Sequence, residues 1–183
     1  MIDRRVINGS KIDSALADEM EKAGLDRIRS CIQCGTCTGS CPSGRRTAMR
    51  TRQLIRKALL GFRDEVLSDP NLWLCTTCGT CTERCPRKID VTEAILFLRN
   101  LSCEAGYMRP EHQGVSHKLI ETGHAVPIDD DKWKKLREDL GLPPLPPTVH
   151  SHPKAVKEVQ YIIKKTGFDK LVNYKGGKKD GKT

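Results

Sequence analysis

One cysteine motif occurs twice in this chain, and it constrains the fold more than any other feature of the sequence. The first copy is followed by Pro42 and has its cysteines at Cys31, Cys34, Cys37 and Cys41. The second copy is followed by Pro86 and has its cysteines at Cys75, Cys78, Cys81 and Cys85. Every cysteine of the second copy lies 44 positions after its counterpart, so the two copies form an internal repeat.

The spacing within each copy is that with which bacterial ferredoxins bind [4Fe–4S] clusters. Three closely spaced cysteines can bind three corners of one cube, and the fourth corner needs a ligand from elsewhere. In two-cluster ferredoxins the fourth cysteine of each copy binds the other cluster. We therefore predict that cluster 1 is held by Cys31, Cys34, Cys37 and Cys85, and cluster 2 by Cys75, Cys78, Cys81 and Cys41. This crossed arrangement places the two clusters close together, as electron hopping requires.

Small and hydroxylated residues recur at fixed places in both copies. Gly35 and Gly79 follow the second cysteine, where a residue without a side chain lets the backbone approach a cluster. Thr36 and Thr80 precede the third cysteine and can offer hydroxyl hydrogen bonds. Hydrogen bonds to the sulfur atoms help to set the potential of a cluster.

Structural zinc and a disulfide framework are the two alternative uses of so many cysteines. Zinc sites pair Cys-x-x-Cys units, often with histidine, and two runs of three cysteines plus Cys-Pro do not divide into such pairs. A disulfide framework is typical of secreted chains, and this N-terminus has no hydrophobic signal region. The motif therefore favours iron–sulfur clusters, which need free thiolates.

The composition leaves room for only a thin hydrophobic core. Hydrophobic residues make up 37% of the 183 residues, and aromatic residues make up 4%. We expect the clusters to join distant parts of the chain, so that folding and cluster binding are coupled. The formal charge of +9 falls to about +5 when eight thiolates and two oxidised cluster cores are counted. A basic electron carrier of this kind is expected to dock on an acidic partner.

A basic chain can also bind nucleic acid, so a structural metal module that binds nucleic acid is the alternative from another class. The one dense block of basic residues follows the first motif and contains Arg45, Arg46, Arg50, Arg52, Arg56 and Lys57. The other basic residues are spread along the chain, and few aromatic residues are interleaved with them for base stacking. We therefore predict no nucleic-acid partner, and iron analysis with salt-dependent binding would separate the two hypotheses.

The sequence predicts a cytoplasmic protein that makes no contact with a membrane. Its longest apolar run, residues 94–98, is far shorter than the roughly 20 residues of a membrane-spanning helix. The missing signal region and the need for free thiolates both fit a reducing compartment.

Helical periodicity extends over most of the chain, and no segment shows convincing strand alternation. The patterns and their capping residues predict helices over residues 10–23, 25–30, 47–60, 63–68, 90–105, 111–121, 130–140 and 151–165. Asp90 and Glu93 form a capping box at the start of the fifth of these helices. We predict an all-α fold, consisting of an alpha-helical ferredoxin module with two [4Fe–4S] clusters and a helical C-terminal extension.

The predicted organisation has four parts. An N-terminal helix (residues 1–24) precedes the two-cluster domain (25–110), a helical extension for subunit docking (111–174) and a disordered tail rich in Gly and Lys (175–183). Within the extension, the segment from Pro143 to Pro147 is expected to be stiff polyproline II, used either as a spacer or to dock in a partner's groove.

Several reactive or aromatic residues are not expected to form sites. Cys103 lies outside both motifs, and we predict that it is a buried small hydrophobe in a helix; a role near a cluster is the alternative. The five histidines do not group as a catalytic or metal-binding set. Trp73 precedes the second motif, where it either shields a cluster or packs in the core. No glycine-rich nucleotide motif occurs, and no catalytic residue is predicted.

The sequences CIQCGTCTGSCP (residues 31–42) and LWLCTTCGTC (residues 72–81) resemble the C subunit of the CoB–CoM heterodisulfide reductase of methanogenic archaea. The size of the chain and its helical pattern are also similar to that family. The resemblance is strong over about residues 25–105 and weak in the tail. All eight ligand positions of the family's motifs are present in this sequence.

This resemblance implies an iron–sulfur subunit that relays electrons in methanogenesis between the A and B subunits of the heterodisulfide reductase. The A subunit of the family holds flavin and splits electron pairs by bifurcation, and the B subunit reduces the mixed disulfide of coenzyme M and coenzyme B. A hydrogenase or a formate dehydrogenase supplies the electrons. The B subunit holds its clusters with adjacent Cys-Cys pairs, and this chain has none, so we expect the disulfide to be reduced elsewhere. Iron–sulfur subunits of related dehydrogenases and heterodisulfide-reductase-like complexes are the alternatives.

Overall fold

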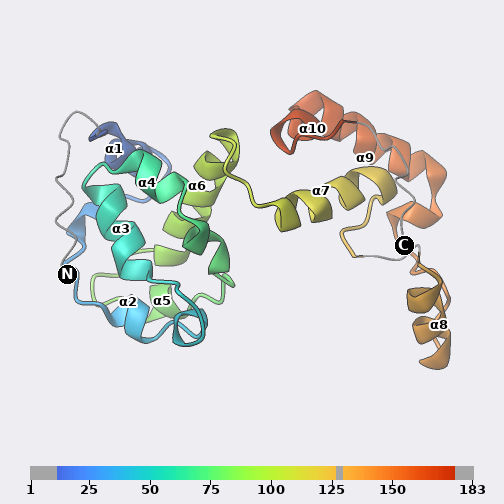
Figure 1. The fold of residues 1–183 in the computed structure, drawn as a ribbon, viewed down its shortest axis with the longest axis horizontal. Helices are drawn as coiled ribbons and strands as arrows, with labels where there is room; N and C mark the ends of the chain where they lie inside the picture. The colour runs from blue at the N-terminus through green and yellow to red at the C-terminus, as the bar shows by residue number, and fades with distance from the viewer. Residues whose placement is uncertain (1–11, 127–129, 176–183) are drawn as a thin grey trace, which may run out of the picture. The chain divides into compact units, whose positions relative to one another are not determined.

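A computed structural model describes residues 12–126 and 130–175, and every regular element within these ranges is a helix. The prediction of an all-α fold is therefore confirmed (Figure 1). The chain divides into two compact units, one ending at Tyr107 and the other beginning at Met108. The predicted tail from residue 176 onward, and the predicted start of the first helix at residue 10, lie outside the described residues.

Each predicted helix has a counterpart in the structure, although the one predicted over residues 25–30 is a short 3₁₀ element (η). Three short helices, over residues 36–39, 80–83 and 168–171, were not predicted. The first unit contains α1 (Ala15–Lys22), η2 (Ile28–Ser30), α2 (Thr36–Gly39), η3 (Ser43–Arg45), α3 (Thr51–Leu59), α4 (Arg63–Leu67), η4 (Pro70–Leu74), α5 (Thr80–Glu83) and α6 (Val91–Glu104). The second unit contains α7 (Pro110–Thr122), α8 (Asp131–Asp139), η5 (Val149–Ser151), α9 (Pro153–Thr166) and α10 (Phe168–Leu171).

Two helices begin later than predicted because polar side chains make turns before them. α1 starts at Ala15, whose backbone N–H donates to Asp13 Oδ1 at 2.9 Å. α3 starts at Thr51 rather than at residue 47, because the Thr47 hydroxyl accepts the Met49 N–H at 3.2 Å. Such side-chain bonds satisfy backbone groups outside the helix and so compete with helix formation.

The longest helix of the first unit, α6, has its predicted cap. The Asp90 side chain accepts the backbone N–H of Glu93 at 3.4 Å, as an N-cap residue should. The helix ends before Gly106, which has a φ of +81°. Its inward face includes Ile95 and Leu98, which are fully buried.

The hydrophobic core of the first unit lies between α1, α3, α4 and α6. Its fully buried side chains include Leu16, Met20, Leu54, Ile95 and Leu98. Most of the motif cysteines pack against this same core. In Figure 1, α2 and α5 lie side by side at the end of the unit that is opposite to α1 and α4, and the two helices are in contact.

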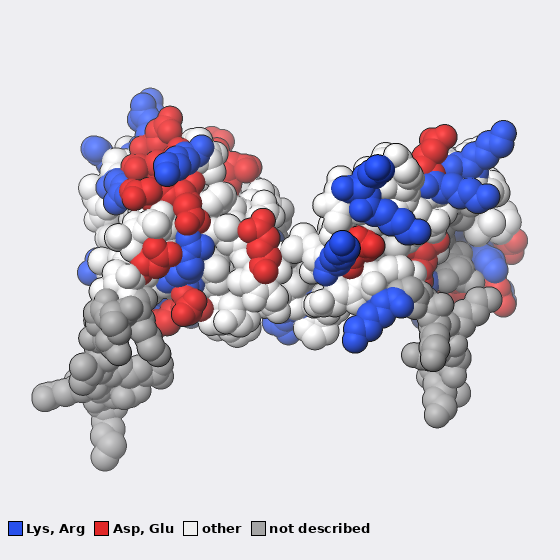
Figure 2. Space-filling view, turned by 90° about the horizontal axis from the view of Figure 1, so that it is seen from above, with Lys and Arg blue, Asp and Glu red and all other residues white. Residues whose placement is uncertain are grey.

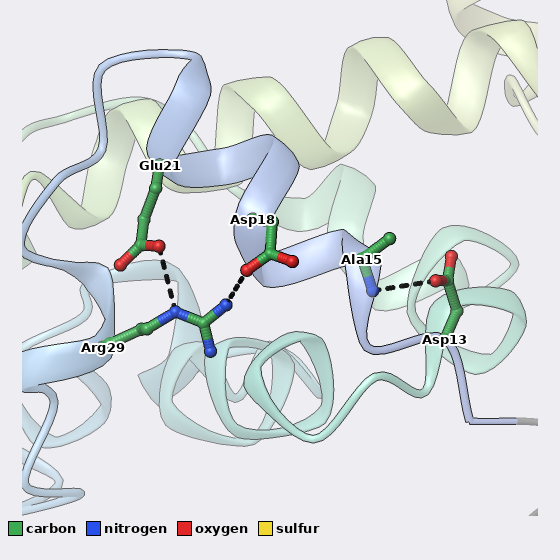
Figure 3. Close-up of polar contacts among 5 residues, drawn as sticks. All are labelled: Asp13, Ala15, Asp18, Glu21 and Arg29. Carbon is green, nitrogen blue, oxygen red and sulfur yellow. Dashed lines mark hydrogen bonds and ion pairs between the residues drawn. The ribbon is translucent and has the colours of Figure 1, made fainter.

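Ion pairs attach α1 to the rest of the first unit. Arg29 lies two positions before the first motif and binds Asp18 and Glu21 of α1 (Figure 3). Arg63 of α4 binds Asp13 and Glu19. These pairs are exposed to solvent, so water screens them and each is expected to contribute little to stability. Figure 2 shows the acidic side chains that gather with basic ones on the face of this unit over α1 and α4.

The second unit is held together mainly by α7 and α9. Its small core contains Ile120, Ile163 and Val172. The His117 ring nitrogen Nε2 lies 2.7 Å from the Val172 carbonyl oxygen, and the ring packs edge-on against Tyr174 at 5.3 Å. His117 is therefore a packing residue, as predicted.

The proline-rich segment does not form the continuous polyproline II conformation that was predicted. Its backbone bends at Pro144 and again at Pro147. The Arg137 Nε–H donates to the Pro143 carbonyl at 2.8 Å, and the Ser151 hydroxyl donates to the Pro146 carbonyl at 2.9 Å. These bonds fold the segment against its neighbours, whereas polyproline II has no internal hydrogen bonds. Among the described helices, none is both long enough and apolar enough to cross a membrane.

Candidate iron–sulfur centres

The first unit contains two cavities that are each walled by four cysteines. The first cavity is lined by Cys31, Cys34, Cys37 and Cys85. The second cavity is lined by Cys75, Cys78, Cys81 and Cys41. Each cavity thus brings together the three leading cysteines of one copy and the last cysteine of the other.

The chain enters both cavities through loops of the same conformation. Gln33 and Thr77, at equivalent places in the two copies, have positive φ values of +57° and +53°. Non-glycine residues rarely adopt this conformation, which costs on the order of 1 kcal/mol. Consecutive backbone N–H groups in such turns form concave anion-binding surfaces. The sequence did not reveal these two residues, because neither belongs to a type that favours positive φ.

The shared geometry of the repeat also explains its two glycines. Gly35 and Gly79 have φ values of +83° and +77° and immediately precede α2 and α5. A Cβ atom at Gly79 would meet no protein atom within 4 Å, and one at Gly35 would meet only Arg52, at 3.7 Å. The positive φ, rather than crowding by the protein, is therefore the requirement that the structure reveals.

Hydroxyl groups contact the most exposed cysteine of each copy, as predicted. Thr36 Oγ1 lies 3.3 Å from Cys34 Sγ, and Thr80 Oγ1 lies 3.4 Å from Cys78 Sγ. These hydrogen bonds are the main cause of the lowered pKa of both the Cys34 and the Cys78 thiol. A lowered pKa favours the thiolate, which is the form that binds iron.

The third cysteine of each copy has the opposite electrostatic environment. Burial raises the pKa of the Cys37 thiol and of the Cys81 thiol. Thr92 Oγ1 lies 3.5 Å from Cys81 Sγ and partly offsets this effect. Negative charge on neighbouring cysteines also raises the pKa of each of these thiols, and for Cys37 these neighbours include Cys81 of the other copy. The two cavities are therefore close enough for their thiols to interact.

Three further N–H groups donate to motif sulfurs, and the sequence did not identify the residues that supply them. The Gln33 side chain donates from Nε2 to Cys31 Sγ at 3.2 Å, and the Thr77 backbone N–H donates to Cys75 Sγ at 3.4 Å. The Gly44 N–H donates to Cys41 Sγ at 3.3 Å. Only glycine fits there, because a Cβ atom at Gly44 would lie 2.8 Å from the Met49 carbonyl oxygen. In the sequence, the presence of Gly44 shortly after the first motif was the signal that could have indicated this contact.

The helices that follow the motifs supply the remaining walls. Ile55 of α3 lines the first cavity, and Ile95 of α6 lines the second. The charged parts of the walls differ, because Arg52 and Arg87 line the first cavity. Among the described residues that line the second cavity, none is charged, and Thr92 stands where the first cavity has Arg52.

The donor set of these cavities fits a multi-iron cluster better than a single metal ion. Four thiols surround each cavity, with N–H and hydroxyl groups directed at the sulfur atoms. Within the described part of the chain, no three Cys, His, Asp or Glu residues converge on one position suited to a metal ion. All nine cysteines are free thiols, which is the state that clusters require.

The residues that were predicted to lie outside the sites line neither cavity. Cys103 of α6 is half-buried, whereas we predicted a buried residue. Trp73 packs against the core and lies under the guanidinium of Arg99, at 5.6 Å from the ring centroid, so packing is its role. Among the described histidines, none belongs to a metal-binding group.

The helical fold and the two four-thiol cavities define an iron–sulfur protein of the ferredoxin-like, all-α class. Consistent with this class, residues 27–89 match the family model described as a 4Fe-4S dicluster domain. [4Fe–4S] clusters are therefore the cofactor of this module. The relatives specify the family further.

The chain is 51% identical over 172 residues to the C subunit of the H(2):CoB-CoM heterodisulfide,ferredoxin reductase of Methanothermobacter marburgensis, with 94% of this chain and 92% of the relative covered. It is 54% identical over 152 residues to the C subunit of the Ferredoxin:CoB-CoM heterodisulfide reductase of Methanosarcina mazei. That match covers 83% of this chain and 92% of the relative. It is 48% identical over 177 residues to the C2 subunit of the H(2)/formate:CoB-CoM heterodisulfide,ferredoxin reductase of Methanococcus maripaludis. That match covers 92% of this chain and 95% of the relative. The chain belongs to the family of CoB–CoM heterodisulfide reductase C subunits, and is an iron–sulfur subunit of an oxidoreductase complex.

Proposed function

We propose that this chain relays electrons through two [4Fe–4S] clusters from the A subunit to the B subunit of a heterodisulfide reductase. The observation that carries the proposal is the pair of neighbouring four-cysteine cavities, each completed by a cysteine from the other copy of the motif. In this proposal the eight motif cysteines are the ligands, with the crossed assignment given above. The chain itself holds no catalytic residue, and the disulfide is reduced on the B subunit.

The residues of the two cavities are suited to electron transfer and to little other chemistry. A [4Fe–4S] cluster accepts and releases single electrons, with a potential set by charge, hydrogen bonds and exposure. The cysteines hold the cluster, and the N–H and hydroxyl groups of Gln33, Thr36, Thr80 and Gly44 stabilise the negative charge on sulfur. The protein's contribution is therefore to fix the position and the potential of the cofactor.

The proximity of the cavities supports a relay. α2 carries Cys37 and α5 carries Cys81, and these two helices are in contact. The thiols of these two cysteines also interact electrostatically. An electron on one cluster would therefore have its next acceptor within the same unit.

The mouth of the first cavity is suited to docking on an acidic partner. Ile32 lines the first cavity and is 61% exposed, although it is a large apolar side chain. Arg52 and Arg87 line the same cavity. The second copy has Thr76 in the place of Ile32. An apolar contact surrounded by basic charge is typical of a redox docking surface, where opposite charge speeds the encounter.

This docking surface can be tested by charge reversal. We expect Arg52→Glu to slow electron exchange with the partner subunits, most strongly at low salt, because screening removes the attraction at high salt. Arg56→Glu is the matched control, since Arg56 is exposed on α3 but lines neither cavity. Equal slowing by both variants would show that net charge, rather than this surface, governs docking.

The names of the three relatives begin with H(2), with ferredoxin and with H(2)/formate, so the named electron source differs among them. For this chain we propose flavin-based electron bifurcation on the A subunit, fed by a hydrogenase or a formate dehydrogenase. We also propose a cytoplasmic complex, which fractionation of native cells would test. Recovery of the complex in the membrane fraction would refute that location.

The decisive experiment is anaerobic purification of the untagged protein from its native host, with iron and sulfide assays and identification of the co-purifying proteins. About eight irons in this chain after its separation from the partners, together with a co-purifying flavoprotein and a Cys-Cys-rich subunit, would support the proposal. About eight irons with another dehydrogenase would keep the relay but change the complex. A protein without iron, or one that binds DNA or RNA in a salt-dependent way, would refute it.

A further inference from the structure

Arg99 on α6 contacts the loop that leads into the second motif. Its Nε–H donates to the Leu72 carbonyl at 3.0 Å, and one terminal NH₂ donates to the Cys75 carbonyl at 2.6 Å. Its guanidinium carbon lies 5.6 Å from the centroid of the Trp73 ring. One side chain thus binds the residues before the motif, the ring within that segment and the first cysteine itself.

The guanidinium of Arg99 lies partly out of contact with solvent. Arg99 is partly buried, and this burial lowers its pKa, an effect that the negative charge of the Cys75 thiolate opposes. Arginine stays protonated in proteins even when its pKa falls. A fixed positive charge therefore lies beside Cys75 in a region where water screens it poorly.

In the part of the chain that the structure describes, the first half of the repeat has an uncharged residue at the position that corresponds to Arg99. Ile55 and Ile95 occupy matching places in the two cavity walls, so positions in α3 correspond to those 40 residues later in α6. By this correspondence Leu59 stands where α6 has Arg99. Leu59 packs against the hydrophobic core and offers neither charge nor hydrogen bonds.

We propose that Arg99 is a positioning residue for the second cluster alone. It fixes the backbone that carries Cys75, and its positive charge raises the reduction potential of the cluster that Cys75 helps to hold. This inference rests on the proposed function, because it requires clusters in both cavities. It goes beyond that function by assigning a specific control of potential to a residue that is not a ligand.

The physical reason lies in the charge that reduction adds. Each one-electron reduction makes the cluster more negative by one unit, and no bond or proton needs to change. A nearby guanidinium stabilises the reduced form more than the oxidised form, so it raises the potential. The Asp90 carboxylate has the opposite charge and reaches the cavity wall only through hydroxyl groups, since it accepts a hydrogen bond from Thr82, whose hydroxyl also bonds that of Thr92. Arg99 is closer to a ligand, because it binds Cys75 directly.

The test is an anaerobic redox titration of the holo protein, followed by electron paramagnetic resonance of each reduced cluster. We expect Arg99→Gln to lower the potential of one cluster and to leave the other unchanged. Arg99→Lys keeps the charge but loses the two-pronged contact, so its potential should lie nearer that of the unaltered protein, with an altered spectrum of the same cluster. Arg56→Gln removes one exposed charge from α3 and is the matched control, with neither potential expected to move.

Assignment of the shifted cluster uses a background that lacks the first cluster. In a protein with Cys31→Ala and Cys34→Ala, the remaining signal should still shift when Arg99→Gln is added. A shift of both clusters by the same amount, or of neither, would overturn the inference. Equal potentials for the Lys and Gln variants would also overturn it, because the charge would then have no role. Absence of iron from the unaltered protein would instead overturn the proposed function.

Discussion

Crossed ligation makes a sharp prediction about pairs of cysteine substitutions. Cys41 and Cys78 line the same cavity although they belong to different copies of the motif, whereas Cys41 and Cys34 belong to one copy but line different cavities. Replacing two of the four ligands should abolish a cluster, because the two remaining thiolates cannot hold four irons. The arrangement of the thiols therefore determines which double variant keeps an intact cluster.

The variant Cys41→Ala/Cys78→Ala should keep about four of about eight irons, all in one intact cluster. The variant Cys41→Ala/Cys34→Ala removes one ligand from each cavity and should leave no intact four-iron cluster. Alanine is preferred to serine, because a serine oxygen can itself bind iron. Iron and sulfide assays give the amounts, and Mössbauer spectroscopy counts the intact clusters.

Cys103→Ala is the matched control, since this ninth cysteine lines neither cavity and its loss should leave all the iron in place. The opposite pattern in the double variants would refute crossed ligation. If Cys41→Ala/Cys34→Ala kept one intact cluster and Cys41→Ala/Cys78→Ala kept none, each copy of the motif would hold its own cluster.

Three further substitutions or treatments test the local geometry. Gly44→Ala would place a Cβ atom 2.8 Å from the Met49 carbonyl oxygen, so iron retention and melting temperature should both fall, and wild-type values would contradict this packing. In apo protein that circular dichroism shows to be folded, Cys34 should be alkylated at lower pH than Cys37, because a hydroxyl bond lowers the pKa of the Cys34 thiol and burial raises the pKa of the Cys37 thiol. Equal pH profiles of alkylation, measured by mass spectrometry on that folded protein, would refute this. Ser102→Ala removes a fully buried hydrogen bond of 2.6 Å from the Ser102 hydroxyl to the Leu67 carbonyl. The free energy of unfolding, measured by anaerobic denaturation, should fall by about 1–3 kcal/mol. No loss would show that the Leu67 carbonyl finds another partner.

Local signals in the sequence predicted the helices well and their starts less well. Asp90 caps α6 as predicted, because the capping side chain and the N–H that it accepts are three positions apart. The start of α3 was predicted too early, because Thr47 looks like a helix cap but makes a separate turn with Met49. The prediction of polyproline II for residues 143–147 was wrong for a related reason, since the backbone bends where the side chains of Arg137 and Ser151 donate to its carbonyls.

The candidate site was predictable where it depends on spacing and unpredictable where it depends on packing. The motif spacing identified the eight cysteines, and the pattern of Thr before the third cysteine identified the hydroxyl bonds. Arg99 could not be found in this way, because it lies 24 positions from Cys75 and the two meet only when α6 packs against η4. Gln33 was missed because its positive φ is imposed by the turn rather than favoured by its side chain.

The differences between the two halves of the repeat favour a relay over a purely structural role for the clusters. The halves share the turn conformation, the glycine and the threonine bond, which are sufficient for holding a cluster. They differ where charge and docking are decided, since Ile32 corresponds to Thr76 and Leu59 to Arg99. Clusters that only joined parts of the chain would need no such differences, whereas a carrier between two unlike partners needs two unlike ends. Two distinct potentials in one chain would therefore support this difference between the two ends, and two identical potentials would count against it.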